Sequence, residues 1–547
     1  MDRANATLRR SRTPHLEWSA LPWALVGLLG ACSASEREAQ VPVPPPTAAT
    51  QAPELDPLEL AIAEHWRAAG VVPVAVADDA ELLRRATLDL AGRIPTADEV
   101  DRFLADVRPD KYEALVDALL RSDAFTEHWA DVLTDTLLGG STLDRPRLRE
   151  GLHAWLRGEL EAGTGWDEMT TEMLAVTGEV ELESPAGFLV AHGRGGQIEA
   201  LTGQTARVFL GLQVQCAQCH DDPDGRFTQR EFYGLAAYYA RTRGGLREVN
   251  GERGARIVDR RRGQLRMPTA SDSPGERSGE LVLPGFPGLD AVPGQGESWR
   301  HALARGVVAS PLFAKAAVNH AWARLFGRGL VEPWDDLGAP QGTDHPPLLD
   351  VLAESFVAHD HDLRHLLRSI VLSSAYQRSS IGGPDGNAAR EQAFAQAAVR
   401  PLAAAPLVRS LLVATGLEDV RGQAFARSVD RRLRKVEQEF AQAFDDDEGA
   451  AADAFTGNVP QALLLLDGEL TNQGVAARRG ALAQLLDDQA RPADRVDALW
   501  RRVYGRPAPP ERAAEALAFL DAHRHTDAAY EDLMHAMLLT SEFLTNH

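Results

Sequence analysis

The pentapeptide at residues 216–220, with the sequence CAQCH, holds two of the three cysteines of this 547-residue chain. Two cysteines separated by two residues and followed by a histidine form the pattern of a c-type haem attachment site. The thiols of Cys216 and Cys219 add to the vinyl groups of the porphyrin, and the imidazole of His220 binds the iron axially. On a helical turn these three side chains share one face. The pentapeptide therefore predicts covalently bound haem c at Cys216, Cys219 and His220.

Two other uses of these residues remain open. In an oxidising compartment Cys216 and Cys219 can close a small disulfide. A divalent metal is the second alternative, because thiolates, the imidazole of His220 and the carboxylate of Asp222 are all metal ligands. The residues at 220–225, HDDPDG, form an acidic turn where a haem needs an apolar cover, and this favours the alternatives.

The sixth ligand of a haem iron at this site would decide its chemistry. Methionine or histidine there favours electron transfer, whereas an open position permits reaction with oxygen or peroxide. The candidates are Met267, in an irregular segment, and His192, the nearest upstream histidine.

The third cysteine stands near the N-terminus. Several arginines precede an apolar stretch at 21–29, which ends at Leu29-Gly30-Ala31-Cys32. A basic region, a short apolar region and small residues at the cut predict a secretory signal, and cysteine directly after Leu-Gly-Ala resembles a bacterial lipobox. We expect residues 1–32 to be a lipoprotein signal peptide, with Cys32 carrying the lipid and Ser33 favouring the outer membrane. A plain signal peptide is the alternative. Either placement suits covalent haem attachment, which bacteria carry out outside the cytoplasm.

The net charge limits the kinds of partner that the protein can bind. The chain has 57 basic and 79 acidic residues, a net charge of −22, which repels phosphate backbones and argues against nucleic acid as a partner. Nearly all basic residues are arginine, which we attribute to codon composition and not to a binding surface. The length and the 44% apolar content predict two hydrophobic cores. After residue 32 the sequence has no stretch long and apolar enough to cross a membrane.

The hydrophobic pattern predicts a mainly α fold. A Pro/Ala-rich tether at 33–55 is followed by a helical domain at 56–243, an irregular linker at 244–297 and a second helical domain at 298–547. Only 255–258 and 264–267 in the linker have the composition of strands that can pair, which leaves room for a short β-hairpin. Three successive helices are expected, the first beginning at a capping box formed by Thr96 and Glu99, the second near Pro109-Asp110 and the third after it. Their apolar stripes are Val100, Phe103, Leu104 and Val107; Leu115, Val116, Leu119 and Leu120; and Phe125, Trp129, Val132 and Leu133.

Three further groups have spacings that permit chemistry, and each has a simpler structural interpretation. Arg84, Arg85 and Asp89 can pair across one helical turn and fix helix packing. The second group could form an acid/base or metal cluster, but we favour an ordinary loop turn because glycine and proline residues surround it. The third is a set of histidines that we expect on an exposed helical surface, because it lacks the glutamate of a zinc-protease motif. The members of these two groups are Asp335, Asp336 and His345, and His359, His361 and His365 respectively.

Several motifs together resemble a known family. LRRATLDLAGRIPT at 83–96, the CxxCH motif and TQREFYGLAAYY at 228–239 resemble the planctomycete cytochrome-like domain. The second half is similar to the partner domain of unknown function that regularly follows it, on the strength of NHAW at 319–322, FGRGLV at 326–331, DDLG at 335–338, SSAY at 373–376 and SEFLTNH at 541–547. The resemblance implies a secreted, mostly helical two-domain protein whose activity is not established.

The chain departs from the family pattern at two positions. Asp222 stands where members commonly have a second histidine after CxxCH, and His320 replaces the arginine of an Asn-Arg-x-Trp motif, exchanging a permanent cation for a titratable one. No cytochrome module precedes the first domain, so we expect any redox partner to be a separate extracytoplasmic protein.

Two function classes follow from these observations. The first is an exported, membrane-anchored c-type haem protein, cytochrome-like, that acts in electron transfer or small-oxidant handling. The alternative is a non-redox surface lipoprotein that binds a partner or a polysaccharide and uses CxxCH as a disulfide or metal site. The sequence contains no nucleophile elbow, phosphate loop or dinucleotide fingerprint.

Overall fold

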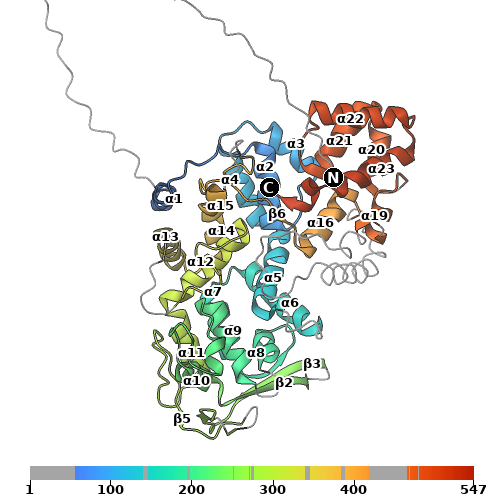
Figure 1. Cartoon of the computed structure of the whole chain (residues 1–547). Coiled ribbons are helices and arrows are strands. Elements are labelled where there is room, and N and C mark those ends of the chain that lie inside the picture. The colour runs from blue at the N-terminus through green and yellow to red at the C-terminus, as the bar shows by residue number, and fades with distance from the viewer. Residues whose placement is uncertain are drawn as a thin grey trace, which may run out of the picture. The chain divides into compact units, whose positions relative to one another are not determined.

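Helices dominate the computed structural model, which confirms the predicted mainly α fold (Figure 1). The signal peptide, the tether and Cys32 lie outside the described residues, which are 56–139, 146–193, 197–249, 252–269, 271–272, 276–338, 345–382, 388–417, 465–466, 468–478 and 480–547.

The first half is built from ten helices and two short 3-10 turns among the described residues. The helices are α1 (Pro57–Ala68), α2 (Asp79–Ala91), α3 (Ala97–Ala105), α4 (Lys111–Leu120), α5 (Asp123–Leu138), α6 (Pro146–Ala162), α7 (Trp166–Ala175), α8 (Ala186–His192), α9 (Ile198–Leu210) and α10 (Gln229–Ala236). The 3-10 turns are η3 (Gln215–Gln218) and η4 (Ala237–Tyr239).

The second half is also helical in its described parts. Its helices are α11 (Trp299–Val308), α12 (Pro311–Phe326), α13 (Pro347–Ala358), α14 (Leu363–Leu372), α15 (Ala388–Gln392), α16 (Ala404–Thr415), α19 (Glu469–Gly474), α20 (Gly480–Asp488), α21 (Pro492–Tyr504), α22 (Pro510–Ala522), α23 (Asp527–Leu538) and α24 (Ser541–Leu544).

The capping signals place the early helices where the sequence predicts them. The Thr96 side chain accepts from the Glu99 N–H, and the Glu99 carboxylate accepts from the Thr96 N–H, forming the predicted capping box of α3. The buried position predicted for Val107 is wrong, because α3 ends at Ala105 and the Val107 side chain is 94% exposed. Pro109 disfavours helical backbone at the residue before it, which helps to separate α3 from α4.

Three small antiparallel sheets complete the fold. The largest has the order β1-β3-β2, with β1 at Gly178–Glu181, β2 at Thr242–Val249 and β3 at Glu252–Asp259. The others pair β4 (Leu265–Arg266) with β5 (Leu281–Val282) and β6 (Arg400–Pro401) with β7 (Thr545–Asn546).

The predicted hairpin is present, but its predicted pairing is wrong. Residues 255–258 belong to β3, which pairs with β2 and β1, and the 264–267 segment contributes β4, which pairs with β5. Val249 of β2 lies opposite Glu252 of β3, and the chain has Asn-Gly between them. This dipeptide is favoured in two-residue hairpin connections, and it indicates that the partner of 255–258 is the strand directly before it, β2.

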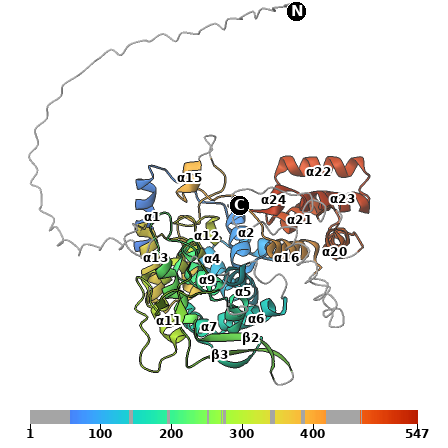
Figure 2. The ribbon, with the colours of Figure 1, turned by 60° about the horizontal axis from the view of Figure 1, so that its bottom comes forward.

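Two large hydrophobic cores hold the elements of the Leu55–His547 unit together, in agreement with the two cores predicted. The first takes side chains from α1 through α14, on both sides of the 244–297 segment, and Trp322 lies fully buried in it. The second joins α16 and α20–α24 with Leu88 and Ile94 from the first half. Figure 2 shows α20–α24 grouped beside α16. None of the helices in the described part is long and apolar enough for a membrane span.

Candidate functional site

The CxxCH motif forms an exposed turn. Cys216 lies in η3, Cys219 directly follows it, and the Cys219 N–H lies 3.4 Å from the Cys216 carbonyl oxygen. Side chains three residues apart on a 3-10 turn are eclipsed, so both thiols project from the same side. Both cysteines are free and exposed, whereas Ala217 between them is fully buried. The turn is thus anchored through Ala217 and presents its two thiols to solvent.

The third residue of the motif, His220, is also exposed, and its ring is oriented by the backbone. Its Nδ1 lies 2.7 Å from the carbonyl oxygen of Asp221. Because a carbonyl oxygen can only accept a hydrogen bond, Nδ1 carries the proton, and in the neutral ring Nε2 keeps its lone pair. Nε2 has no hydrogen-bond partner among the described residues, so His220 presents a free ligand atom beside the two thiols.

The acidic turn after His220 is held by its own chain. Asp222 is only 5% exposed, and its carboxylate accepts from the Asp224 N–H at 2.8 Å and from Arg226 Nη2 at 3.3 Å. Asp221 accepts from the N–H of Gln229, the first residue of α10, at 2.7 Å. The Asp222 oxygens are therefore occupied by protein donors. The part of the chain that the structure describes contains no group of three His, Cys, Asp or Glu side chains arranged to hold a metal ion.

Asp335 and Asp336 connect this region to the second half of the chain. Arg226 Nη1 donates to Asp336 at 2.6 Å, and this hydrogen bond raises the pKa of the Arg226 guanidinium. Asp335 accepts from Arg207 Nε of α9 at 2.5 Å. The two carboxylates thus form ion pairs with two arginines of the first half.

His345 does not join Asp335 and Asp336. Its Nδ1 lies 3.2 Å from the Lys315 ammonium, and its Nε2 lies 3.0 Å from the Leu337 carbonyl oxygen. One ring nitrogen thus contacts Lys315 of α12 and the other contacts the backbone at Leu337, so His345 does not form the acid/base cluster considered from the sequence.

A second group of polar residues lies in the interior around Asp89 of α2. Asp89 is 8% exposed, and its carboxylate accepts four hydrogen bonds. The Tyr376 hydroxyl donates at 2.7 Å, Arg400 Nη2 donates to both oxygens at 2.9 and 2.8 Å, and Asn546 Nδ2 donates at 2.8 Å. Burial raises the pKa of Tyr376 well above its ordinary value, and the nearby Asp89 charge adds to the increase. Tyr376 therefore remains a neutral donor.

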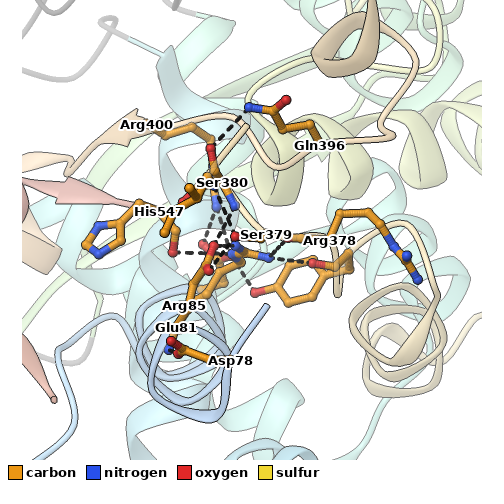
Figure 3. Close-up of polar contacts among 12 residues, drawn as sticks. Asp78, Glu81, Arg85, Arg378, Ser379, Ser380, Gln396, Arg400 and His547 are labelled. Atoms are coloured by element: carbon orange, nitrogen blue, oxygen red, sulfur yellow. Dashed lines mark hydrogen bonds and ion pairs between the residues drawn. The ribbon is translucent and has the colours of Figure 1, made fainter. Parts of the chain in front are cut away.

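Arg85 lies beside this carboxylate and bonds to other groups. Its Nη1 donates to the carbonyl oxygens of Tyr376 and Arg378 at 2.6 and 2.7 Å, and its Nη2 pairs with Glu81 (Figure 3). The second carboxylate oxygen of Glu81 accepts from the Ser379 hydroxyl at 2.9 Å. The spacing had suggested that Arg85 pairs with Asp89 one turn later. The partner is instead Glu81, one turn earlier, and Asp89 pairs with Arg400.

Arg84 reaches the other end of the chain. It is 1% exposed and donates through Nη2 to the carbonyl oxygens of Glu542 and Phe543, each at 3.0 Å. Burial lowers the pKa of Arg84 to about 10. Its charge is retained at neutral pH because these carbonyl dipoles solvate it.

A cavity of about 10 Å³ lies within this group, which is the volume needed for one water molecule. Arg85, Tyr376, Arg400 and Asn546 supply its polar lining. The close packing leaves no room for a substrate, so the polar group around Asp89 acts as a structural joint.

The comparisons with protein families divide the chain in two. Residues 57–244 match PSCyt2, described as a protein of unknown function (DUF1549), and residues 299–520 match PSD1, described as a protein of unknown function (DUF1553). The chain carries a DUF1549 domain followed by a DUF1553 domain. This tandem is a planctomycete-type two-domain arrangement. No curated protein and no solved structure matches the chain.

The polar group around Asp89 joins these two domains. Asp89 belongs to the DUF1549 domain, Arg400 belongs to the DUF1553 domain, and Asn546 lies beyond the matched residues in β7. The ion pair between Arg226 and Asp336 is a second connection between the domains, and it ends at the acidic turn beside CxxCH.

The titratable residue of the DUF1553 motif, His320, is kept neutral. Burial lowers its pKa well below the ordinary value, and the charges of Arg324 and Arg207 lower it further. Its ring lies 4.7 Å from that of Trp334, and its Nε2 lies 3.0 Å from the Thr136 hydroxyl. Histidine at this position, unlike the arginine that the sequence resemblance implies, therefore carries no charge at neutral pH.

The three histidines at 359–365 are not on one helical surface as predicted. The helix α13 ends at Ala358, α14 begins at Leu363, and His361 between them has a positive φ of 52°. The rings of His359 and His365 stack with centroids 3.5 Å apart, while His361 packs on Phe313 and Phe356. The left-handed turn separates His361 from the other two.

Both candidate sixth ligands are engaged in the packing of the protein. His192 is 8% exposed, and its Nε2 lies 2.8 Å from the Leu137 carbonyl oxygen, which occupies that nitrogen. Met267 follows β4 and packs against the first core.

Proposed function

We propose that this protein is an exported, membrane-anchored c-type haem protein that transfers electrons or handles a small oxidant. Haem would be attached to Cys216 and Cys219, with His220 as the axial ligand of the iron. The orientation of His220 carries the proposal. The hydrogen bond from Nδ1 to the Asp221 carbonyl fixes the tautomer in which Nε2 is a free ligand atom, the arrangement that metal-binding histidines commonly use.

The two thiols support the same assignment. They project from one side of η3 and are exposed, so covalent addition to a porphyrin needs no rearrangement of the core. Haem bound there supplies reversible one-electron chemistry of iron. The neighbouring Tyr233 remains a neutral phenol, because burial raises its pKa.

The acidic turn gives this haem an exposed edge. Asp221 and Asp222 are held by α10 and Arg226, which leaves the turn hydrophilic. An exposed edge permits electron exchange with another protein, so a separate extracytoplasmic redox or surface protein is the expected partner. Lipidation of Cys32 would hold the protein at the cell envelope. Ser33, the residue after the lipidated cysteine, would direct it to the outer membrane.

Expression with a haem-attachment system tests the cofactor. The purified full chain should give a pyridine haemochrome spectrum of haem c at one haem per chain. The Cys216→Ser/Cys219→Ser variant should lose the covalent haem, and His220→Ala should change the iron spectrum. Replacement of the exposed His301 by Ala is the matched control and should change neither. A colourless protein with unreacted thiols or a disulfide would overturn the haem proposal.

A second experiment tests the location. Cys32→Ala should release the protein from the membrane fraction into the soluble extracytoplasmic fraction, and the unchanged chain should incorporate labelled fatty acid. An unmodified Cys32 in the membrane fraction would contradict the lipid anchor.

The non-redox alternative rests on the exposure of the motif. Neither Cys216 nor Cys219 has the apolar cover that haem ordinarily receives, and the surroundings are acidic. In that case a surface lipoprotein binds a partner or a polysaccharide, and the cysteines close a disulfide or bind a divalent metal with His220. Thiol titration and metal analysis of the colourless protein separate these two uses. Replacement of both cysteines by serine should then lower thermal stability without loss of partner binding.

A further inference from the structure

One segment of this acidic protein is strongly basic. Nine arginines lie at 241–266, against the three acidic residues Glu248, Glu252 and Asp259, in a chain with a net charge of −22. Codon composition, the explanation suggested by the sequence, raises the arginine content everywhere and does not account for such local concentration. We call residues 241–266 the basic hairpin; its arginines are Arg241, Arg243, Arg247, Arg253, Arg256, Arg260, Arg261, Arg262 and Arg266.

The strand register gathers three of these arginines on one face. Residues directly opposite each other on paired strands project from the same face. Arg243 lies opposite Val258, and Gly245 lies opposite Arg256. Since alternate residues of a strand share a face, Arg247 joins Arg243 and Arg256 there. The opposite face carries Ala255 and Ile257, which are buried in the first core.

The basic face is accessible. Arg243, Arg247 and Arg256 are all exposed, and Figure 1 shows β2 and β3 extending past α8. Val258 adds an apolar side chain, 36% exposed, to the same face. The register of β1 places two exposed carboxylates on this face as well, those of Glu179 opposite Arg256 and Glu181 opposite Gly254. The accessible surface therefore combines three arginines and some apolar area with two acidic side chains at one edge, and the cations of 260–262 continue beyond it.

The ion pairs within the protein compensate few of these charges. Arg256 lies 3.7 Å from Glu179, with both side chains more than half exposed, so the pair is weak. Arg243 donates to the carbonyl oxygens of Ala240 and Thr242, which carry no net charge. Arg266 likewise donates only to a backbone carbonyl oxygen, that of Gly279. Within the described residues, the other exposed arginines of the segment without a side-chain partner are Arg247, Arg253, Arg260, Arg261 and Arg262.

We propose that the basic hairpin binds an anionic membrane surface through lipid phosphate groups. The guanidinium group pairs with phosphate in a two-point geometry, which favours a phosphate-bearing partner. The arginines are spread along two strands and the segment that follows, and do not converge on one pocket, so they match an extended surface better than a single small anion. The acidic remainder of the protein is repelled by such a surface, and the basic hairpin would therefore face it.

The choice of a membrane as the anionic partner rests on the proposed lipid anchor. One acyl chain gives only marginal membrane binding, and a basic patch is a second signal that strengthens it. The basic hairpin would supply that signal and orient the protein on the membrane.

Vesicle binding tests this inference on protein that carries neither the lipid anchor at Cys32 nor haem. The full chain with Cys32→Ala is mixed with vesicles of phosphatidylcholine alone or with a third of phosphatidylglycerol, and sedimentation gives the bound fraction. Binding is expected only to the anionic vesicles, and it should weaken as salt screens the charges. The variant Arg243→Gln/Arg247→Gln/Arg256→Gln should bind on the order of 100-fold more weakly, from roughly fivefold for each charge removed.

A matched control separates the local charge from the total charge. Arg67→Gln/Arg102→Gln/Arg121→Gln removes three exposed arginines of the helices and should retain full vesicle binding. Circular dichroism confirms that each variant is folded. Equal loss in both triple variants, or no preference for anionic vesicles, would overturn the inference. Self-association that depends on the basic hairpin, with no vesicle binding, would instead assign the face to a second copy of the chain. The vesicle test uses protein without the lipid anchor, and the anchor itself is tested by fractionation and fatty-acid labelling. Failure of the anchor is therefore distinguished from failure of the basic hairpin to bind.

Discussion

Arg400 Nη2 lies 2.9 and 2.8 Å from the two carboxylate oxygens of Asp89, which makes this pair a direct electrostatic link between the DUF1549 and DUF1553 domains. Asp89 comes from α2, and Arg400 comes from β6, which pairs with the final strand β7. The link therefore joins α2, near the start of the described chain, to the pair of strands β6 and β7, and β7 is the last described strand.

Replacement of Asp89 by Asn should strongly destabilise the protein. The change leaves the Arg400 charge without its partner and turns one accepting oxygen into a donor that faces other donors. Removing one member of a buried ion pair costs about 3–5 kcal/mol. We expect a clear decrease in the midpoint of thermal unfolding, measured by circular dichroism.

The matched control for this prediction is Asp98→Asn on α3, an exposed aspartate. Surface substitutions of this kind change stability by about 0.5 kcal/mol or less. Similar midpoints for the two variants would show that the Asp89 pair contributes nothing to domain association.

Tyr376→Phe should destabilise the same joint by a smaller amount. The hydroxyl donates to Asp89 at 2.7 Å, and loss of a hydrogen bond to a charged group costs about 1.5–3 kcal/mol. Because both residues act on one carboxylate, the effects of Tyr376→Phe and Asp89→Asn should not add. The double variant should be more stable than the sum of the single losses predicts. Strict additivity would indicate that the hydroxyl and the carboxylate do not interact.

Local signals in the sequence predicted much of the fold, because helix starts and apolar stripes depend on neighbouring residues. The capping box at Thr96 and Glu99 lies where expected, and the stripe of Phe125, Trp129 and Leu133 is buried on α5. The strand partners were missed because pairing at 255–258 was judged from composition, although Asn250-Gly251 favours the adjacent strand.

The polar joint was only half predictable for a different reason. Spacing along α2 identified Arg84, Arg85 and Asp89 as a structural group, but the partners Arg400 and Asn546 are more than 300 residues away in the sequence. Only the packed structure brings them together. The CxxCH residues were recognised from their spacing, whereas the hydrogen bond that orients His220 needed the folded turn.

Asp336→Asn should loosen the connection between the DUF1553 domain and the CxxCH turn. It removes the charge that pairs with Arg226, and Arg226 in turn holds Asp222. The side chains of Arg226 and Asp336 are 28% and 10% exposed, so we expect a loss of about 1–2 kcal/mol, between the values for surface and buried pairs. Hydrogen exchange should become faster at 221–227. Asp494→Asn, which breaks a more exposed pair with Arg491, is the control and should leave exchange at 221–227 unchanged.

His128 should make the protein sensitive to acid. Burial, and to a smaller extent the charge of Arg409, lower its pKa from 6.5 to about 3, although Asp131 partly opposes the decrease. The folded protein therefore keeps His128 neutral at a pH where the unfolded chain binds a proton. Its contribution to stability is complete above pH 6.5 and is lost as the pH falls toward 3, by up to about 1.4 kcal/mol per pH unit.

His128→Gln should remove this dependence. At pH 8 the histidine is neutral in both states, so any difference in the unfolding midpoint there reports only the change in packing against Gly92 and Trp129. Below pH 6.5 the midpoint of the variant should fall less steeply than that of the unchanged protein, because one proton fewer is taken up on unfolding. Parallel curves from pH 8 to pH 4 would mean that His128 already binds a proton in the folded state, and that its buried environment does not keep it neutral.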